Sequence, residues 1–134
     1  SRGLGDVYKR QVLDYNKELA SNYFIQSKEI IRFYEKYFGD YQWYEDGYKL
    51  IEVPYLGMEH QSAVTYGNGF SMYNGVRSKS WPMYGVIDPL IIHETGHEWF
   101  GNSFTASDPT HIWIHEGLQV YSESIYFEDK FNKI

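Results

Sequence analysis

Residues 90–100, LIIHETGHEWF, constrain the fold most strongly, because histidines and glutamates lie there inside an otherwise apolar segment. A helix is predicted, since Asp88 suits the N-cap and Pro89 the first helical position, and we expect it to run to about residue 100. Each helical residue turns by about 100°, so His93 and His97 are roughly 40° apart, with Glu94 in the same broad sector. Buried polar groups need partners, so the fold must place one opposite this sector.

These residue types are the ones that bind zinc. Imidazole nitrogens are good zinc ligands, and catalytic zinc sites use three protein ligands and leave one position for water. Glu116 is the candidate third ligand, because the 18 residues between it and His97 allow a helix to end and a second helix to return alongside. His93, His97 and Glu116 would then hold one Zn²⁺, with Glu94 as general base. The alternative is a surface helix with two solvated histidines, which the apolar flanks disfavour.

Three further residues near the motif have weaker predictions. Glu123 lies seven residues after Glu116, on nearly the same helical face. It could accept a hydrogen bond from the outer nitrogen of a ligand histidine, or be an ordinary solvated glutamate. We expect His111 to be solvated and His115 to be a cleft group near the site and not a ligand.

The hydrophobic pattern predicts an α+β fold with a small sheet and three main helices. The helices are expected at about 14–38, 88–100 and 110–130, with Gly39 ending the first. A turn at Asp46-Gly47 precedes a strand at 49–53, which Pro54 ends. Residues 55–70 are expected to form a second extended segment, and 67–82 a loop.

Composition excludes several classes of protein. The 134 residues are 43% hydrophobic and 19% aromatic, which supports a packed core. The net charge of −6 argues against a nucleic-acid partner, since phosphate binding needs clustered Lys and Arg. No apolar stretch is long enough to span a membrane. The absence of cysteine excludes disulfide scaffolds, thiolate metal sites and thiol catalysis.

The two ends of the chain suggest an incomplete gene product. One back-translation of the first eleven residues, SRGLGDVYKRQ, matches a transposon adapter used to prepare sequencing libraries. We therefore interpret residues 1–11 as not native and residues 12–134 as part of a catalytic domain. The last residues, YFEDKFNKI, have a helical pattern without a stop signal. The sequence accordingly assigns no compartment and no oligomeric state.

Three motifs in order, GMEHQSAVTYGN, HETGHEWFGN and WIHEGL, resemble the catalytic domain of the gluzincin zinc aminopeptidases. That family includes alanyl aminopeptidase and leukotriene hydrolase, and the resemblance covers residues 12–134. It implies a partial thermolysin-like catalytic domain. It matches His93, His97 and Glu116 to the zinc ligands and Glu94 to the general base.

The resemblance also assigns a substrate-binding segment. Gly57, Met58, Glu59 and His60 match an edge strand that pairs with the substrate backbone in the family. Glu59 matches the glutamate that grips the free amino terminus, which makes the enzyme an exopeptidase. His60 stands where the family pattern has Asn, so backbone recognition differs in detail at this position.

The expected function is a zinc aminopeptidase fragment acting on peptides with a free N-terminus. The family stabilises the oxyanion with a tyrosine well downstream of the glutamate ligand, and only 18 residues follow Glu116 here. The isolated segment is therefore expected to be poorly active. The alternatives are a zinc endopeptidase of similar fold and a non-catalytic peptide-binding module, with epoxide hydrolysis a remote third.

Overall fold

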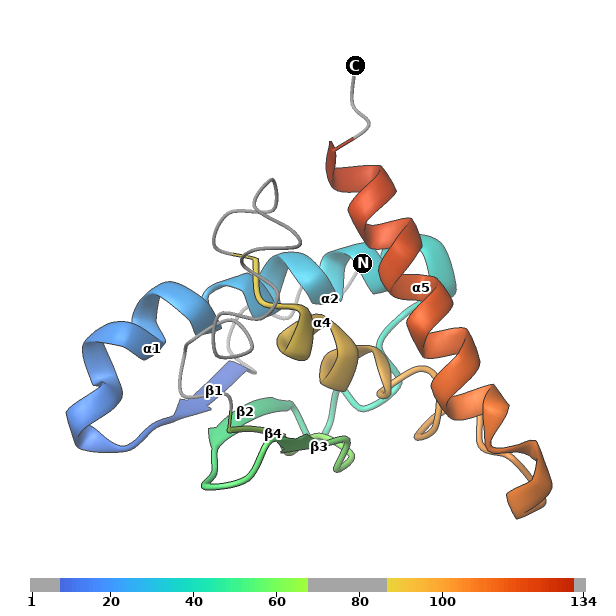
Figure 1. Cartoon of the computed structure of the whole chain (residues 1–134), viewed down its shortest axis with the longest axis horizontal. Helices are drawn as coiled ribbons and strands as arrows, with labels where there is room; N and C mark the ends of the chain where they lie inside the picture. Colours follow the sequence, from blue (N-terminus) through green and yellow to red (C-terminus); the bar gives the residue numbers. More distant parts are fainter. Residues whose placement is uncertain (1–7, 68–86, 132–134) are drawn as a thin grey trace.

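The computed structural model of the chain describes residues 8–67 and 87–131 (Figure 1). The strands are β1 (Tyr8–Gln11), β2 (Tyr48–Glu52), β3 (Gly57–Met58) and β4 (Val64–Tyr66). The helices are α1 (Lys17–Phe24), α2 (Gln26–Phe38), α4 (Pro89–Gly96) and α5 (Trp113–Phe131), with short 3-10 helices at Asp14–Asn16 and Pro109–His111. This content confirms the predicted α+β class. The predicted loop at 67–82 falls almost wholly outside the described residues.

The four strands form one mixed sheet in the order β1-β2-β4-β3. Strands β1, β2 and β4 run parallel, with Leu50 opposite Val64, whereas β3 is antiparallel to β4, with Met58 opposite Thr65. Strand β3 therefore forms one edge of the sheet, with a side that pairs with no other strand among the described residues. Strand β1 lies within the segment interpreted as adapter-derived. That interpretation stays a prediction, and every candidate site residue lies at position 57 or beyond.

The described part of the segment predicted at 55–70 contains two strands, β3 and β4, and not one extended segment. The chain reverses between β3 and β4, where Ala63 N–H donates to the His60 carbonyl (3.0 Å). Ser62 has a positive φ of 59°, a conformation that is uncommon for residues other than glycine. The sequence HQSA carries no Gly, Pro or Asn at this turn, which is why the reversal was missed.

The predicted first helix is interrupted at Ile25. Helix α1 ends at Phe24, α2 begins at Gln26, and the Ser27 hydroxyl donates to the Phe24 carbonyl (2.7 Å) across the break. Such bonds from serine to nearby carbonyls compete with the regular helical pattern. The prediction that Gly39 ends this helix is confirmed, since it follows α2 with φ 96°.

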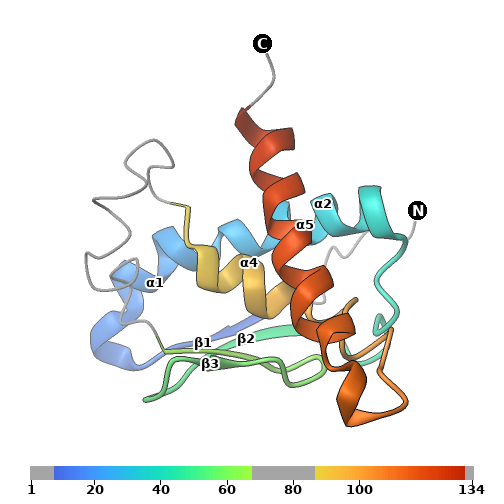
Figure 2. The same ribbon diagram turned by 45° about the vertical axis from the view of Figure 1, so that its right-hand side comes forward.

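Helix α4 lies at the centre of the fold, between the sheet and α2, as the two views in Figures 1 and 2 show. It contacts β3, β4, α2 and α5. The Asp88 side chain caps it by accepting from Leu90 N–H (2.9 Å), as predicted. The helix ends at Gly96 and not near residue 100, because the chain then tightens into turns in which Asn102 N–H donates to the His97 carbonyl (3.0 Å). Gly101, at φ 128°, completes this reversal.

Helix α5 crosses one end of α4 and is joined to it by a buried polar cluster (Figure 2). The Gln119 amide donates to the Tyr34 hydroxyl (2.9 Å) and the Ile92 carbonyl (3.2 Å). Tyr34 is also 2.9 Å from the Ser122 hydroxyl. Gly96 has to be glycine here, because a Cβ at this position would overlap the side chains of Gln119 and Tyr34. The cluster fixes the angle at which α5 presents its first turn to α4.

No helix within residues 8–67 and 87–131 combines the length and the apolar character that a membrane span needs.

Candidate metal centre

The structure brings together His93 of α4, His97 at the C-cap of that helix and Glu116 of α5. One potential ligand atom from each lies within 4.8 Å of the others. The Nε2 atoms of His93 and His97 are 3.2 Å apart, and Glu116 Oε2 lies 3.6 Å from His93 Nε2 and 3.7 Å from His97 Nε2. Ligands at 2.0–2.1 Å from a tetrahedral zinc ion are about 3.3 Å apart. The donor set and its spacing therefore fit one zinc ion.

The outer nitrogens of both histidines have acceptors. His93 Nδ1 lies 2.7 Å from Glu123 Oε1, and His97 Nδ1 lies 2.8 Å from the Phe100 carbonyl. If each Nδ1 carries the proton and donates, both Nε2 lone pairs face the space shared with Glu116. This is the tautomer that binding a metal through Nε2 requires.

The two histidines differ in their electrostatic surroundings. Burial lowers the pKa of His93, but its hydrogen bond to Glu123 and the nearby carboxylates outweigh burial, so the net shift is upward. The pKa of His97 is lowered, chiefly because its side chain is buried at 1% exposure. Glu116 is the open side of the cluster, since its side chain is 53% exposed.

Glu94 lies against the edge strand β3. Its residue is 7% exposed, and burial raises its pKa to about 7, with His93 opposing the shift and Glu59 adding to it. A Cβ built at Gly57 would lie only 2.6 Å from Glu94 Oε1. Glycine at position 57 therefore makes room for the Glu94 carboxylate beside the strand.

The predicted substrate-binding segment lies next to this cluster. Gly57 and Met58 form β3, Glu59 and His60 follow it, and Glu59 is half-buried whereas His60 is exposed. The Glu59 carboxylate is near enough to raise the pKa of Glu94. The edge strand, the candidate base and the candidate ligands thus border one region.

Two residues near the site were not singled out from the sequence. Glu98 is 1% exposed, and its Oε1 accepts from Ser62 N–H (2.6 Å). Asn102 donates from its amide to the Glu59 carbonyl (3.0 Å). The one sequence feature that could have identified Glu98 is a carboxylate among apolar residues at the end of the predicted helix. No comparable feature distinguishes Asn102. His115, expected as a group near the site and not a ligand, accepts from Ala106 N–H through Nε2 (2.9 Å) and so holds the loop before α5.

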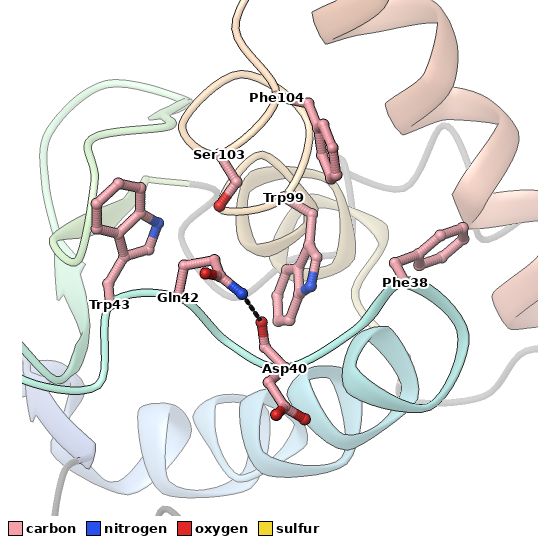
Figure 3. A pocket seen from close by; sticks show the side chains of 7 residues that line it. All are labelled: Phe38, Asp40, Gln42, Trp43, Trp99, Ser103 and Phe104. Carbon is pink, nitrogen blue, oxygen red and sulfur yellow. Dashed lines mark hydrogen bonds between the residues drawn. The ribbon is translucent and has the colours of Figure 1, made fainter.

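A separate pocket of about 450 Å³ lies beside Trp99 (Figure 3). It is lined by Phe38, Asp40, Gln42, Trp43, Trp99, Ser103 and Phe104. Figure 3 shows the Gln42 amide bonded to the Asp40 carbonyl between the two indole rings. No candidate ligand or base lines this pocket, so the metal cluster, and not this hollow, defines the candidate site.

Two histidines one helical turn apart, meeting a glutamate from the next long helix, are the arrangement of the gluzincin peptidases. The chain belongs to peptidase family M1: residues 23–134 match the Peptidase family M1 domain. This confirms the resemblance drawn from the three motifs, and it makes the chain part of a peptidase family.

Individual relatives agree with the family. Human endoplasmic reticulum aminopeptidase 2 is 32% identical over 114 residues, which are 82% of this chain and 12% of that protein. Bovine aminopeptidase N is 33% identical over 78 residues, 56% of this chain and 8% of that protein. Mouse aminopeptidase Q is 50% identical over 38 residues, 28% of this chain and 7% of that protein. The chain thus spans about an eighth or less of the length of these relatives.

Proposed function

We propose that this chain carries the zinc-binding part of a thermolysin-like catalytic domain in an aminopeptidase. The observation that carries the proposal is the convergence of His93, His97 and Glu116 within 4.8 Å, beside an edge strand that Glu59 directly follows. The relatives named aminopeptidase support the same reaction class. The activity belongs to the longer protein, in which other segments complete the cleft.

The three ligands and Glu94 have separate tasks in this proposal. A zinc ion held by His93, His97 and Glu116 supplies Lewis acidity toward water and the substrate carbonyl. Glu94 accepts the proton of the attacking water and passes it to the leaving amine. Its position beside Gly57 places that carboxylate next to the strand along which the substrate would lie.

Glu59 supplies the selectivity for a free N-terminus. Its carboxylate pairs with the substrate ammonium one residue from the scissile bond, while the open edge of β3 and His60 hydrogen-bond the substrate backbone. An acylated N-terminus has no positive charge and leaves the Glu59 carboxylate unpaired. The substrates are therefore peptides with a free amino terminus.

The test is hydrolysis of alanyl-p-nitroanilide by the full-length gene product, compared with its N-acetylated form. We expect cleavage of the free amine only, and Glu94→Gln should lower kcat by about 10²- to 10⁴-fold while zinc content stays at one per chain. Equal cleavage of peptides with free and blocked termini would identify an endopeptidase instead. A full-length protein without zinc or activity would favour a peptide-binding module.

A further inference from the structure

Two side chains just beyond the metal-binding histidines hold the same loop. Glu98 accepts from Ser62 N–H through Oε1 (2.6 Å), and Asn102 donates to the Glu59 carbonyl (3.0 Å). Both partners are backbone groups of the segment between β3 and β4. That segment begins with Glu59, the residue proposed to bind the substrate ammonium.

The hydrogen bond from Ser62 N–H to Glu98 is buried, and it supports the uncommon backbone conformation of Ser62. Glu98 is 1% exposed, so its hydrogen bond competes little with water. Ser62 has φ 59°, a conformation that persists only when its surroundings enforce it. Its carbonyl also accepts from Lys49 N–H (3.2 Å), so the turn is fixed from the sheet as well as from Glu98.

Asn102 makes hydrogen bonds both to Glu59 and to His97, a candidate metal ligand. Asn102 N–H donates to the His97 carbonyl (3.0 Å), while the Asn102 side chain donates to the Glu59 carbonyl. His97 Nδ1 is in turn paired with the Phe100 carbonyl within the same reversal. A short chain of hydrogen bonds therefore relates the backbone of Glu59 to that of His97.

We propose that Glu98 and Asn102 are positioning residues that clamp the 59–62 loop to the residues at the end of α4. In this way they set the distance from the Glu59 carboxylate to the zinc ligands. This inference rests on the proposed function only for the role of Glu59. The distance decides which substrate bond lies over the metal when the ammonium is paired. Neither residue touches substrate, and each acts through Glu59.

The kinetic test uses alanyl-p-nitroanilide and the full-length gene product. Asn102→Ala should raise KM about 3- to 10-fold, the effect of losing one hydrogen bond, with a smaller change in kcat and unchanged zinc content. Glu98→Ala should act in the same direction. Glu98→Gln keeps an oxygen acceptor for Ser62 N–H and should restore KM to within about 2-fold of wild type.

Thr105→Ala is the matched control. The Thr105 hydroxyl donates to the Gly101 carbonyl (2.6 Å) in the same reversal, and this hydrogen bond does not involve the 59–62 loop. It should leave KM and kcat unchanged. A general loosening of the reversal would instead alter KM in Thr105→Ala as much as in Asn102→Ala, and would overturn the clamp.

A double-mutant cycle isolates the coupling to Glu59. In a Glu59→Gln background, Asn102→Ala should change KM by less than about 2-fold, because the ammonium contact that it positions is already lost. If the two effects simply multiply, Asn102 does not act through Glu59 and the proposal is wrong.

Amide hydrogen exchange tests the clamp without any activity. Exchange of residues 59–63 should accelerate about 10-fold in Asn102→Ala and in Glu98→Ala, and remain near wild type in Glu98→Gln. Unchanged exchange in Asn102→Ala overturns the clamp even if the enzyme is an aminopeptidase. Accelerated exchange in a protein without aminopeptidase activity would support the clamp and reject the proposed function. Asn102 is only half-buried, so its variant carries the test if Glu98→Ala does not fold.

Discussion

At the scale of single residues, two glycines shape the site as much as the side chains around them do. Gly57 leaves space for the Glu94 carboxylate, and Gly96 leaves space for Gln119 and Tyr34. The outer nitrogens of His93 and His97 each lie within hydrogen-bond distance of an acceptor. The geometry of the ligand atoms is therefore set by neighbours that would not bind the metal themselves.

Gly57→Ala tests the space beside the edge strand. The new methyl group would lie 2.6 Å from Glu94 Oε1, and that carboxylate is the flexible end of its side chain, so it should move and not unfold the protein. We expect kcat of the full-length enzyme to fall at least about 10-fold while melting temperature and zinc content stay near wild type. A variant with wild-type kcat would show that Glu94 is not displaced or not needed.

Glu123→Ala tests the partner of His93. Losing the 2.7 Å contact with His93 Nδ1 should weaken zinc binding about 10- to 100-fold, the usual effect of removing such a partner. Competition with a chromophoric chelator measures the affinity. Glu123→Gln keeps an acceptor oxygen and should lose less. Equal affinity in all three proteins would reduce Glu123 to an ordinary surface glutamate.

At the scale of elements, α4 is held by α2 and α5 through the buried cluster around Tyr34. Burial raises the pKa of Tyr34 well above its ordinary value, so its hydroxyl stays protonated and available as a hydrogen-bond donor. Its partners Gln119 and Ser122 come from α5, and both the Tyr34 hydroxyl and the Gln119 amide donate to the Ile92 carbonyl in α4. This cluster joins the two helices that supply the candidate ligands.

Tyr34→Phe should therefore destabilise the protein, because Gln119 and Ser122 lose a buried partner. The expected cost is about 1–3 kcal/mol in the free energy of unfolding, measured as a lower melting temperature of the full-length protein. Tyr37→Phe is the matched control in the same helix, since its hydroxyl bonds Asp129 at the surface. A similar shift in both variants would mean that the buried cluster contributes no special stability.

The sequence was sufficient for some elements and not for others. Helix α4 was predicted because Asp88, Pro89 and the apolar flanks are local signals. Residues at i and i+4, such as His93 and His97, lie on the same face of any helix. The break at Ile25 and the reversal at Ser62 have no Gly or Pro to mark them. The bonds of Glu98 and Asn102 join segments 36 and 43 residues apart, and such pairings leave no periodic pattern in one sequence.

At the scale of the whole molecule, the chain combines a candidate ligand set with a small part of the length of its relatives. It spans 12% of the length of human endoplasmic reticulum aminopeptidase 2. On α5, Trp113, Val120 and Tyr121 are more than half exposed, and Glu116 shares this open side. The candidate ligands meet within 4.8 Å of one another on this open side.

The isolated 134-residue chain should accordingly be a poor catalyst. We expect its kcat/KM for alanyl-p-nitroanilide to be at least about 100-fold below that of the full-length protein, because the family resemblance implies an oxyanion tyrosine further downstream. Parallel assays at equal zinc occupancy measure the ratio. Turnover by the isolated chain equal to that of the full-length protein would place all catalytic groups within these residues.

The central claim is that His93, His97 and Glu116 hold one zinc ion, and zinc X-ray absorption of the full-length protein tests it most directly. We expect one zinc per chain with about four nitrogen or oxygen ligands at 2.0–2.2 Å, and loss of that site in His97→Ala. Absence of zinc from the wild-type protein, or the same zinc spectrum in His97→Ala, would contradict it.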